Sequence, residues 1–377
     1  MTPPPSFASG LKQVALFLFT IVLSLIITPV LAQQEGSAAF GYAEGRITAI
    51  DREEAVAVIR LDDGRVVGAD LGETLPGDPA GPVLPQFEVG QRVEVYYSPA
   101  PEGGINFAVS DWIRRPALIW LAVLFLGVSV AVARFKGLRA FVATGGSLLI
   151  VIAYVVPAIL QGQHPVLVSL LGVGSILLLA IYFVHGINWS TTAAVVGTFV
   201  AVLVTMALGI IWTDLAHLTG FGNEDAMLIS FHASQVNMRG LLLAGMLIGA
   251  LGALTDITIV QASVIRELAH TNPTMGIAGL YRHGMNVGLD HIGSLVNTLV
   301  LAYVGTALPL MMLLHLSDMP LTQQLNLEMV ATEVVHTIVG SIGLILAVPV
   351  TTILAAFLFR GDRIPVAKGE LDHGHSH

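Results

Sequence analysis

Long apolar segments constrain this chain more than any other feature. A helix that crosses a bilayer needs roughly 18 or more apolar residues in a row. Hydrophobic residues make up 54% of the 377 residues and charged residues only 11%, which excludes an ordinary water-soluble domain. We predict an all-α polytopic membrane bundle of about seven transmembrane helices over residues 116–360. The expected spans are 116–133, 140–160, 165–185, 191–213, 240–262, 289–314 and 329–359.

The first 32 residues have the features of a secretory signal. Lys12 precedes an apolar stretch from 14 to 27, and Ala32 provides a small residue at a cleavage point. An uncleaved first span has the same pattern, so we expect residues 1–32 to be a signal peptide or a first transmembrane helix. In both cases the segment that follows lies outside the cytoplasm.

Residues 33–111 are predicted to form a small extracytoplasmic β-rich domain. Polar and apolar residues alternate in 92–97 and in parts of 45–50 and 55–61, which is typical of strands with one buried face. The Asp-Asp-Gly sequence at 62–64 favours a hairpin turn. Several short strands in fewer than 80 residues indicate a small barrel, similar to an OB-fold. We expect it to be a structural cap or a docking module.

The net charge of −9 is concentrated in this same domain. Residues 33–111 contain 14 acidic and 5 basic side chains, whereas the rest of the chain contains 12 of each. An acidic excess gives no support for binding nucleic acid, which we therefore do not expect among the partners. The lipid bilayer itself is the partner that the composition requires.

The distribution of Lys and Arg predicts the orientation of the bundle. Loops on the cytoplasmic side are enriched in these residues. If the β-rich domain is external, eight basic residues near the spans are cytoplasmic and three are external. The eight are Arg134, Lys136, Arg139, Arg266, Arg282, Arg360, Arg363 and Lys368, and the three are Arg114, Arg115 and Arg239. The His-containing tail, 361–377, is then cytoplasmic.

Two connections are expected to be longer than a turn. Residues 214–238 are predicted to be external, and 265–289 cytoplasmic, with Pro273 ending any helix that begins at Ser263. Pro349 lies deep in the last span, where a proline removes a helix hydrogen bond and can bend or break the helix.

A stripe of glycines in the fifth span ends at a carboxylate. Gly245, Gly249, Gly252 and Asp256 follow one another at steps of four, three and four residues, so they share one helix face within about 40°. Small residues let helices approach closely in lipid, so we expect Asp256 to lie in a tight seam. An ionised group in a membrane is costly, which makes Asp256 a candidate binding residue. The structural alternative is a satisfied hydrogen bond between helices.

The sixth and seventh spans combine polar and small residues in the same way. The candidate solute or ion ligands are Asp290, His291 and Asn297 in the sixth span and Glu333 and His336 in the seventh, and the candidate packing glycines are Gly293, Gly340 and Gly343. For each polar residue, a place at the membrane interface or a hydrogen bond between helices is the structural alternative.

The expected depth in the membrane divides the candidate ligands into an inner and an outer group. At 1.5 Å per residue, Asp256 lies about 24 Å from the external start of its span near Gly240. Asp290 and Asn297 fall at the same depth, so we expect Asp256 to face them, with a shared proton, a bound cation or an arginine compensating the two carboxylates. Glu333 and its neighbours are expected near the outer end of the same path.

Catalytic motifs are absent from the sequence. It contains no His-Glu-x-x-His, Gly-x-Ser-x-Gly, P-loop or dinucleotide fingerprint, and no cysteine. We therefore expect no enzyme and no cofactor. A metal is left undecided, because the external connection holds His217, Glu224, Asp225 and His232 without a metal-ligand spacing, and the tail ends in His373, His375 and His377.

Two sequence runs in the fifth and sixth spans match a known pattern. The first is LLLAGMLIGALGALTD, from Leu241 to Asp256, and the second is NTLVLAYVGTALP, from Asn297 to Pro309. Together with the Gly-Ser-Ile-Gly run at 340–343, they resemble the YibE/F-like family of bacterial membrane proteins. Thr255 departs from the pattern, where a more apolar residue is expected. The resemblance implies a polytopic protein of the plasma (inner) membrane, sometimes labelled a permease, and implies no substrate.

Two functions are consistent with these features. In the first, the chain is a secondary transporter or permease for a small solute or ion, bound by the carboxylates of the fifth and sixth spans, and Asp256→Asn abolishes transport. In the second, it is a membrane scaffold or assembly factor that docks a partner through its external domain. The sequence leaves the oligomeric state, including a homo-oligomer, open.

Overall fold

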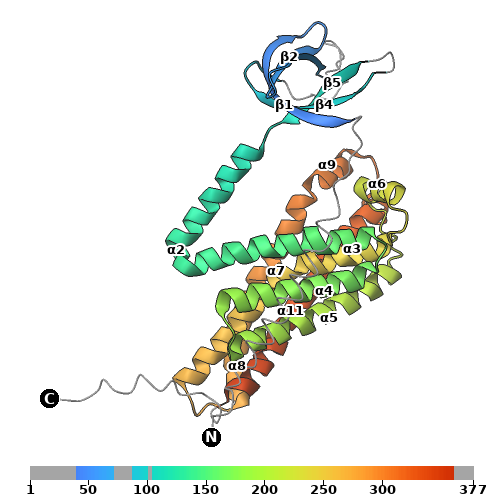
Figure 1. The fold of residues 1–377 in the computed structure, drawn as a ribbon. Coiled ribbons are helices and arrows are strands. Elements are labelled where there is room, and N and C mark those ends of the chain that lie inside the picture. The colour runs from blue at the N-terminus through green and yellow to red at the C-terminus, as the bar shows by residue number, and fades with distance from the viewer. Residues whose placement is uncertain (1–39, 72–86, 101–103, 361–377) are drawn as a thin grey trace, which may run out of the picture. The chain divides into compact units, whose positions relative to one another are not determined.

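The computed structural model describes residues 40–71, 87–100 and 104–360, and the chain divides into two compact units (Figure 1). One unit, Gln33–Val132, contains a small β-barrel and the start of a long helix. The other contains the helical bundle from Ala133 onward. The predictions for the signal segment, 1–32, and for the tail, 361–377, lie outside the described residues.

The barrel consists of five strands, whose bounds are β1 (Gly41–Asp51), β2 (Val56–Leu61), β3 (Val66–Asp70), β4 (Arg92–Pro99) and β5 (Ile105–Trp112). They close in the order β1-β2-β3-β5-β4, and all neighbours are antiparallel except β3 and β5. Burial alternates along β2, where Ala57, Ile59 and Leu61 are in the core. Gly64 adopts a φ of +89° in the turn between β2 and β3. The predicted β-rich domain and its hairpin are therefore confirmed.

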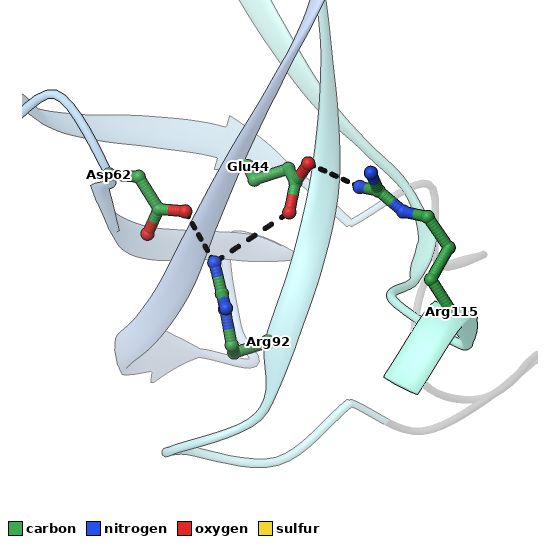
Figure 2. Close-up of polar contacts among 4 residues, drawn as sticks. All are labelled: Glu44, Asp62, Arg92 and Arg115. Atoms are coloured by element: carbon green, nitrogen blue, oxygen red, sulfur yellow. Dashed lines mark hydrogen bonds and ion pairs between the residues drawn. The ribbon is translucent and has the colours of Figure 1, made fainter. Parts of the chain in front are cut away.

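An ion-pair network joins the barrel to the first helix, α2 (Arg115–Ile150). The guanidinium of Arg92 pairs with Asp62 in the β2–β3 turn and lies 3.6 Å from Oε2 of Glu44 on β1, and Glu44 also pairs with Arg115 (Figure 2). Exposed pairs of this kind each contribute little free energy. Their shared carboxylate nevertheless ties the first turn of α2 to the barrel wall.

The described residues of the other unit are mostly helical. After α2 come a π-helical turn η1 (Val151–Val155), α3 (Val156–Leu160), α4 (Pro165–Leu178), a second π-helical turn η2 (Leu179–Phe183), α5 (Trp189–Leu215), α6 (Glu224–His232), α7 (Met238–Thr271), α8 (Ile277–Thr306), α9 (Leu308–Leu316), α10 (Leu321–Gln324) and α11 (Glu328–Phe359).

Six helical runs in the described part of the chain are long and apolar enough to cross a membrane. They are Arg115–Leu160, Pro165–Phe183, Trp189–Leu215, Met238–Thr271, Ile277–Thr306 and Glu328–Phe359. The first is 46 residues long and combines two predicted spans. Its backbone leaves the helical region at Arg134, with φ 52° and ψ −131°, where charged residues separate the two apolar segments. The described chain is thus mostly helical, with six helical runs that could span a membrane.

One expectation about helix ends was wrong. The connection predicted at 265–289 is short, because α7 continues to Thr271 and α8 begins at Ile277. Pro273 does follow the end of α7, but α8 starts well before its apolar part because Leu280 and Gly284 pack into the bundle. Pro349 lies inside α11 without ending it.

Helices α5, α7 and α11 form the centre of the bundle, α4 packs against α7, and α8 packs against α11 and α7. Small residues bring α5 and α11 together. A Cβ added to Gly343 would overlap the hydroxyl of Thr205, and one added to Gly197 would overlap that of Thr351. Close backbone approach of this kind is the main source of helix association in lipid.

Candidate functional site

Asp256 and its glycine stripe are exposed. Helix α7 turns its larger apolar side chains, such as Leu254 and Ile257, into the core. Gly245 and Gly252 have no atom of the described chain within 4 Å of an added Cβ, apart from their own helix and chain neighbours. The seam expected at Asp256 is therefore not formed by the part of the chain that the structure describes. The reason is physical: Leu and Ile offer far more contact area than glycine, so they determine which face of α7 turns inward.

The predicted cluster of Asp256 with the sixth span is not formed either. On α8 the residues packed inward are Leu280, Gly284, Gly288 and Leu299, while Asp290, Asn297 and Gly293 are exposed and His291 is half-buried. Nδ1 of His291 lies 3.1 Å from the carbonyl oxygen of Val287, one turn back on its own helix. Within the described residues, Asp256 makes no hydrogen bond or ion pair with Asp290 or Asn297. The titratable neighbour of Asp256 is His185, which follows η2.

Glu333 and His336, on the first turns of α11, do belong to a common site. The imidazole of His336 lies against the ring of Tyr303, near the end of α8, with ring centroids 4.5 Å apart and planes tilted by 44°. Tyr303 and Glu333 also line one common cavity. The site therefore contains a carboxylate, an imidazole and a phenol from two helices.

Gly249 of α7 completes this site. A Cβ at Gly249 would lie 3.1 Å from Nε2 of His336 and 3.1 Å from the hydroxyl of Tyr303. Both of these polar atoms are buried and have no hydrogen-bond partner within the described residues. Buried polar groups without a partner are costly, so two of them side by side mark a candidate binding site. Of the predicted packing glycines, Gly249 is thus the one that contacts candidate ligands.

A cavity of about 670 Å³ opens beside this cluster. Tyr303 and Glu333 line it. Four further polar residues come from α9, the connection between α9 and α10, α10 itself, and α11. The other polar lining residues are His315, Ser317, Gln324 and Thr337, and the apolar ones are Val304, Ala307, Leu310, Met311, Leu314, Leu321, Leu325, Val330, Val334 and Ile338. The cavity lies between the C-terminal end of α8, the short helices that follow it and the N-terminal half of α11.

A second polar group, which the sequence analysis missed, lies at the centre of the bundle. Nε2 of Gln261 donates to the carbonyl oxygen of Gly284 at 2.9 Å and to Oγ1 of Thr352 at 2.7 Å, joining α7, α8 and α11. The hydroxyls of Thr198 and Thr258 are 2.6 Å apart between α5 and α7. These hydrogen bonds hold α7 against α5, α8 and α11. The sequence signal was a glutamine within an apolar run, five residues after Asp256.

Within the described residues, no three His, Asp or Glu side chains are placed to hold a metal ion. This includes the connection between α5 and α7, where Asn223 caps α6 by accepting from the backbone N–H of Ala226 at 2.7 Å. Glu328 at the start of α11 instead accepts from the backbone N–H groups of Thr219 and Gly220, at 2.7 and 2.8 Å. The acidic residue near this loop therefore has a structural role.

Fold and site together define a class: a mostly helical protein with six runs that could span a membrane, a small β-barrel, and a polar site beside a cavity in its bundle. A model of the family described as YibE/F-like protein matches residues 121–361, which is well over half of the chain. The chain belongs to this family. No curated protein matches it. No solved structure matches it either.

Proposed function

We propose that the chain is a secondary transporter or channel-like permease of the plasma (inner) membrane for a small solute or ion. Glu333, His336 and Tyr303 form its binding site. The observation that carries this proposal is a half-buried carboxylate on a cavity, next to two buried polar atoms without partners. An unpaired ionisable residue in a membrane segment is costly and is typical of substrate or proton pathways.

The proposed topology follows from the break at Arg134. A helix of 46 residues would be about 69 Å long at 1.5 Å per residue, more than twice the roughly 30 Å of a hydrocarbon core. Two crossings in this run give seven in total. The Lys and Arg distribution supports an external barrel and a cytoplasmic C-terminus. The strand order and the parallel pair of β3 and β5 support an OB-like barrel.

Metabolite profiling of a deletion strain, followed by uptake of the affected solute in vesicles containing the purified chain, tests the proposal. We expect uptake by the wild type, and a loss of at least about tenfold in Glu333→Gln, since removal of a buried charge partner costs several kcal/mol. Asp256→Asn, on the exposed face of α7, is the matched carboxylate control. Full uptake by Glu333→Gln would exclude this site.

The alternative is a scaffold or assembly factor that docks a partner through the barrel, and one observation favours it. Phe40 and Tyr42 are 57% and 63% exposed, and both rings lie next to Tyr96, at centroid distances of 6.5 and 5.4 Å. Exposed aromatic clusters are common in binding surfaces. Deletion of residues 33–111 would then abolish function, whereas Glu333→Gln would leave it intact.

A further inference from the structure

The substrate class of the cavity beside Glu333 follows from its shape and charge. We propose that this cavity accepts a hydrophobic organic cation, whose positive centre lies between Glu333 and the ring of Tyr303. The proposal rests on the proposed function, since it names what the permease would carry.

The lining determines the body of the ligand. Ten of the sixteen side chains that line the cavity are apolar, and Met311 is among them. Met is a polarizable residue that adapts to varied apolar ligands. A volume of about 670 Å³ lies within the range of about 300–1,000 Å³ typical of sites for drug-sized molecules. A small hydrated ion would leave this apolar surface unused.

Charge determines the sign of the ligand. Among the described residues, Glu333 is the only carboxylate that lines the cavity, and no Lys or Arg lines it. Glu333 forms no ion pair within this part of the chain. A bound cation supplies the missing counter-charge in a setting of low dielectric, where such a pair is strong. An anion of the same shape would be repelled by Glu333.

The aromatic groups favour the same sign. A cation within about 6 Å of an aromatic ring is attracted by the negative face of the ring. Tyr303 and Glu333 both line the cavity, so ring and carboxylate act on the same region. The phenol oxygen of Tyr303 and Nε2 of its neighbour His336 are further electron-rich groups without partners.

Binding of tetraphenylphosphonium to the purified full-length chain in detergent tests the proposal, with tetraphenylborate as a probe of nearly equal size and opposite charge. We expect the wild type to bind the cation at least about tenfold more tightly than the anion. Equal affinity for the two probes, or preference for the anion, would overturn the proposal and indicate a site for lipid chains.

Two variants test the residues. Glu333→Gln should remove the preference for the cation, and Tyr303→Leu should weaken cation binding several-fold. The matched control is Asp318→Asn, which removes an exposed carboxylate from the connection between α9 and α10 and should leave the preference unchanged. A preference that survives Glu333→Gln, or that is lost in Asp318→Asn, contradicts the assignment.

Flux measurements distinguish the proposed transport function from the proposed cation specificity of the cavity. Vesicles that contain the chain should take up tetraphenylphosphonium, driven by an inside-negative potential, faster than vesicles that contain Glu333→Gln. Selective binding without such a difference refutes transport and retains the cation site. Uptake of a different solute, without selective cation binding, retains the permease and refutes the substrate class.

Discussion

Helix packing at Gly343 provides a quantitative prediction. An alanine Cβ at this position would overlap the hydroxyl of Thr205 and lie 3.2 Å from its Cβ. Overpacking of this kind costs about 1–3 kcal/mol, and the better helix propensity of alanine offsets up to about 1 kcal/mol. We therefore expect Gly343→Ala to lower the free energy of unfolding by about 1–2 kcal/mol.

A double-mutant cycle isolates this contact. Thr205→Ala removes the overlapping hydroxyl, so the double variant Thr205→Ala/Gly343→Ala should be more stable than the two single effects predict when summed, by about 0.5 kcal/mol or more. Gly245→Ala is the matched control, because its added Cβ meets open space. It should be neutral or slightly stabilising.

The assay is reversible unfolding of the purified chain in mixed micelles, followed by circular dichroism as the fraction of denaturing detergent rises. Equal stability of Gly343→Ala and Gly245→Ala would refute the close approach of α5 and α11. A strictly additive cycle would show that Thr205 is not the neighbour that limits Gly343.

Three further predictions concern other parts of the molecule. Gln261→Leu removes two interhelical hydrogen bonds worth about 0.6 kcal/mol each, so it should lower the free energy of unfolding by about 1 kcal/mol in the same assay. Asp256→Asn should not lower it, because the side chain is exposed and a charge in a membrane-spanning helix is costly; a clear loss would indicate a covered and compensated carboxylate. A hydrogen bond and ion pair with Arg114 lower the pKa of Asp111 from its ordinary value of 3.8. This stabilisation is complete above that value and is lost as the pH falls through the lowered pKa, so Asp111→Asn should unfold with a weaker dependence on acid pH; an unchanged profile would contradict the pairing.

Local patterns in the sequence were sufficient for the elements of the fold. Alternating residues predicted β4, the Asp-Asp-Gly sequence predicted the β2–β3 hairpin, and apolar length predicted the long helices. The charged residues between the first two apolar segments were interpreted as a connection, whereas the chain is helical there and its backbone leaves the helical region only at Arg134. The end of α7 was placed too early and the start of α8 too late, because hydropathy marks the apolar part of a helix and not its polar ends.

Rotation of the helices was not predictable in the same way. Periodicity showed that Gly245, Gly252 and Asp256 share a face, but only the neighbouring helices determine whether that face turns inward. Glu333 and His336 were identified because they are ionisable residues within an apolar helix. Tyr303 was not predicted as a site residue, since a tyrosine in a membrane helix has no distinctive pattern of its own. It lies within the run at 297–309 that carries the family resemblance.

As a binding site, the cavity beside Glu333 should be open to water. Because the chain contains no cysteine, a single introduced thiol tests this claim directly. Thr337→Cys places a thiol on the cavity lining, and Leu346→Cys places one on an exposed face of the same helix, midway along α11. Thiols react with a water-soluble maleimide as thiolates, which form in water and not in lipid. In membrane vesicles we predict that Thr337→Cys is labelled and Leu346→Cys is not. Failure to label Thr337→Cys, in a chain that is labelled at both positions after denaturation, would contradict the claim.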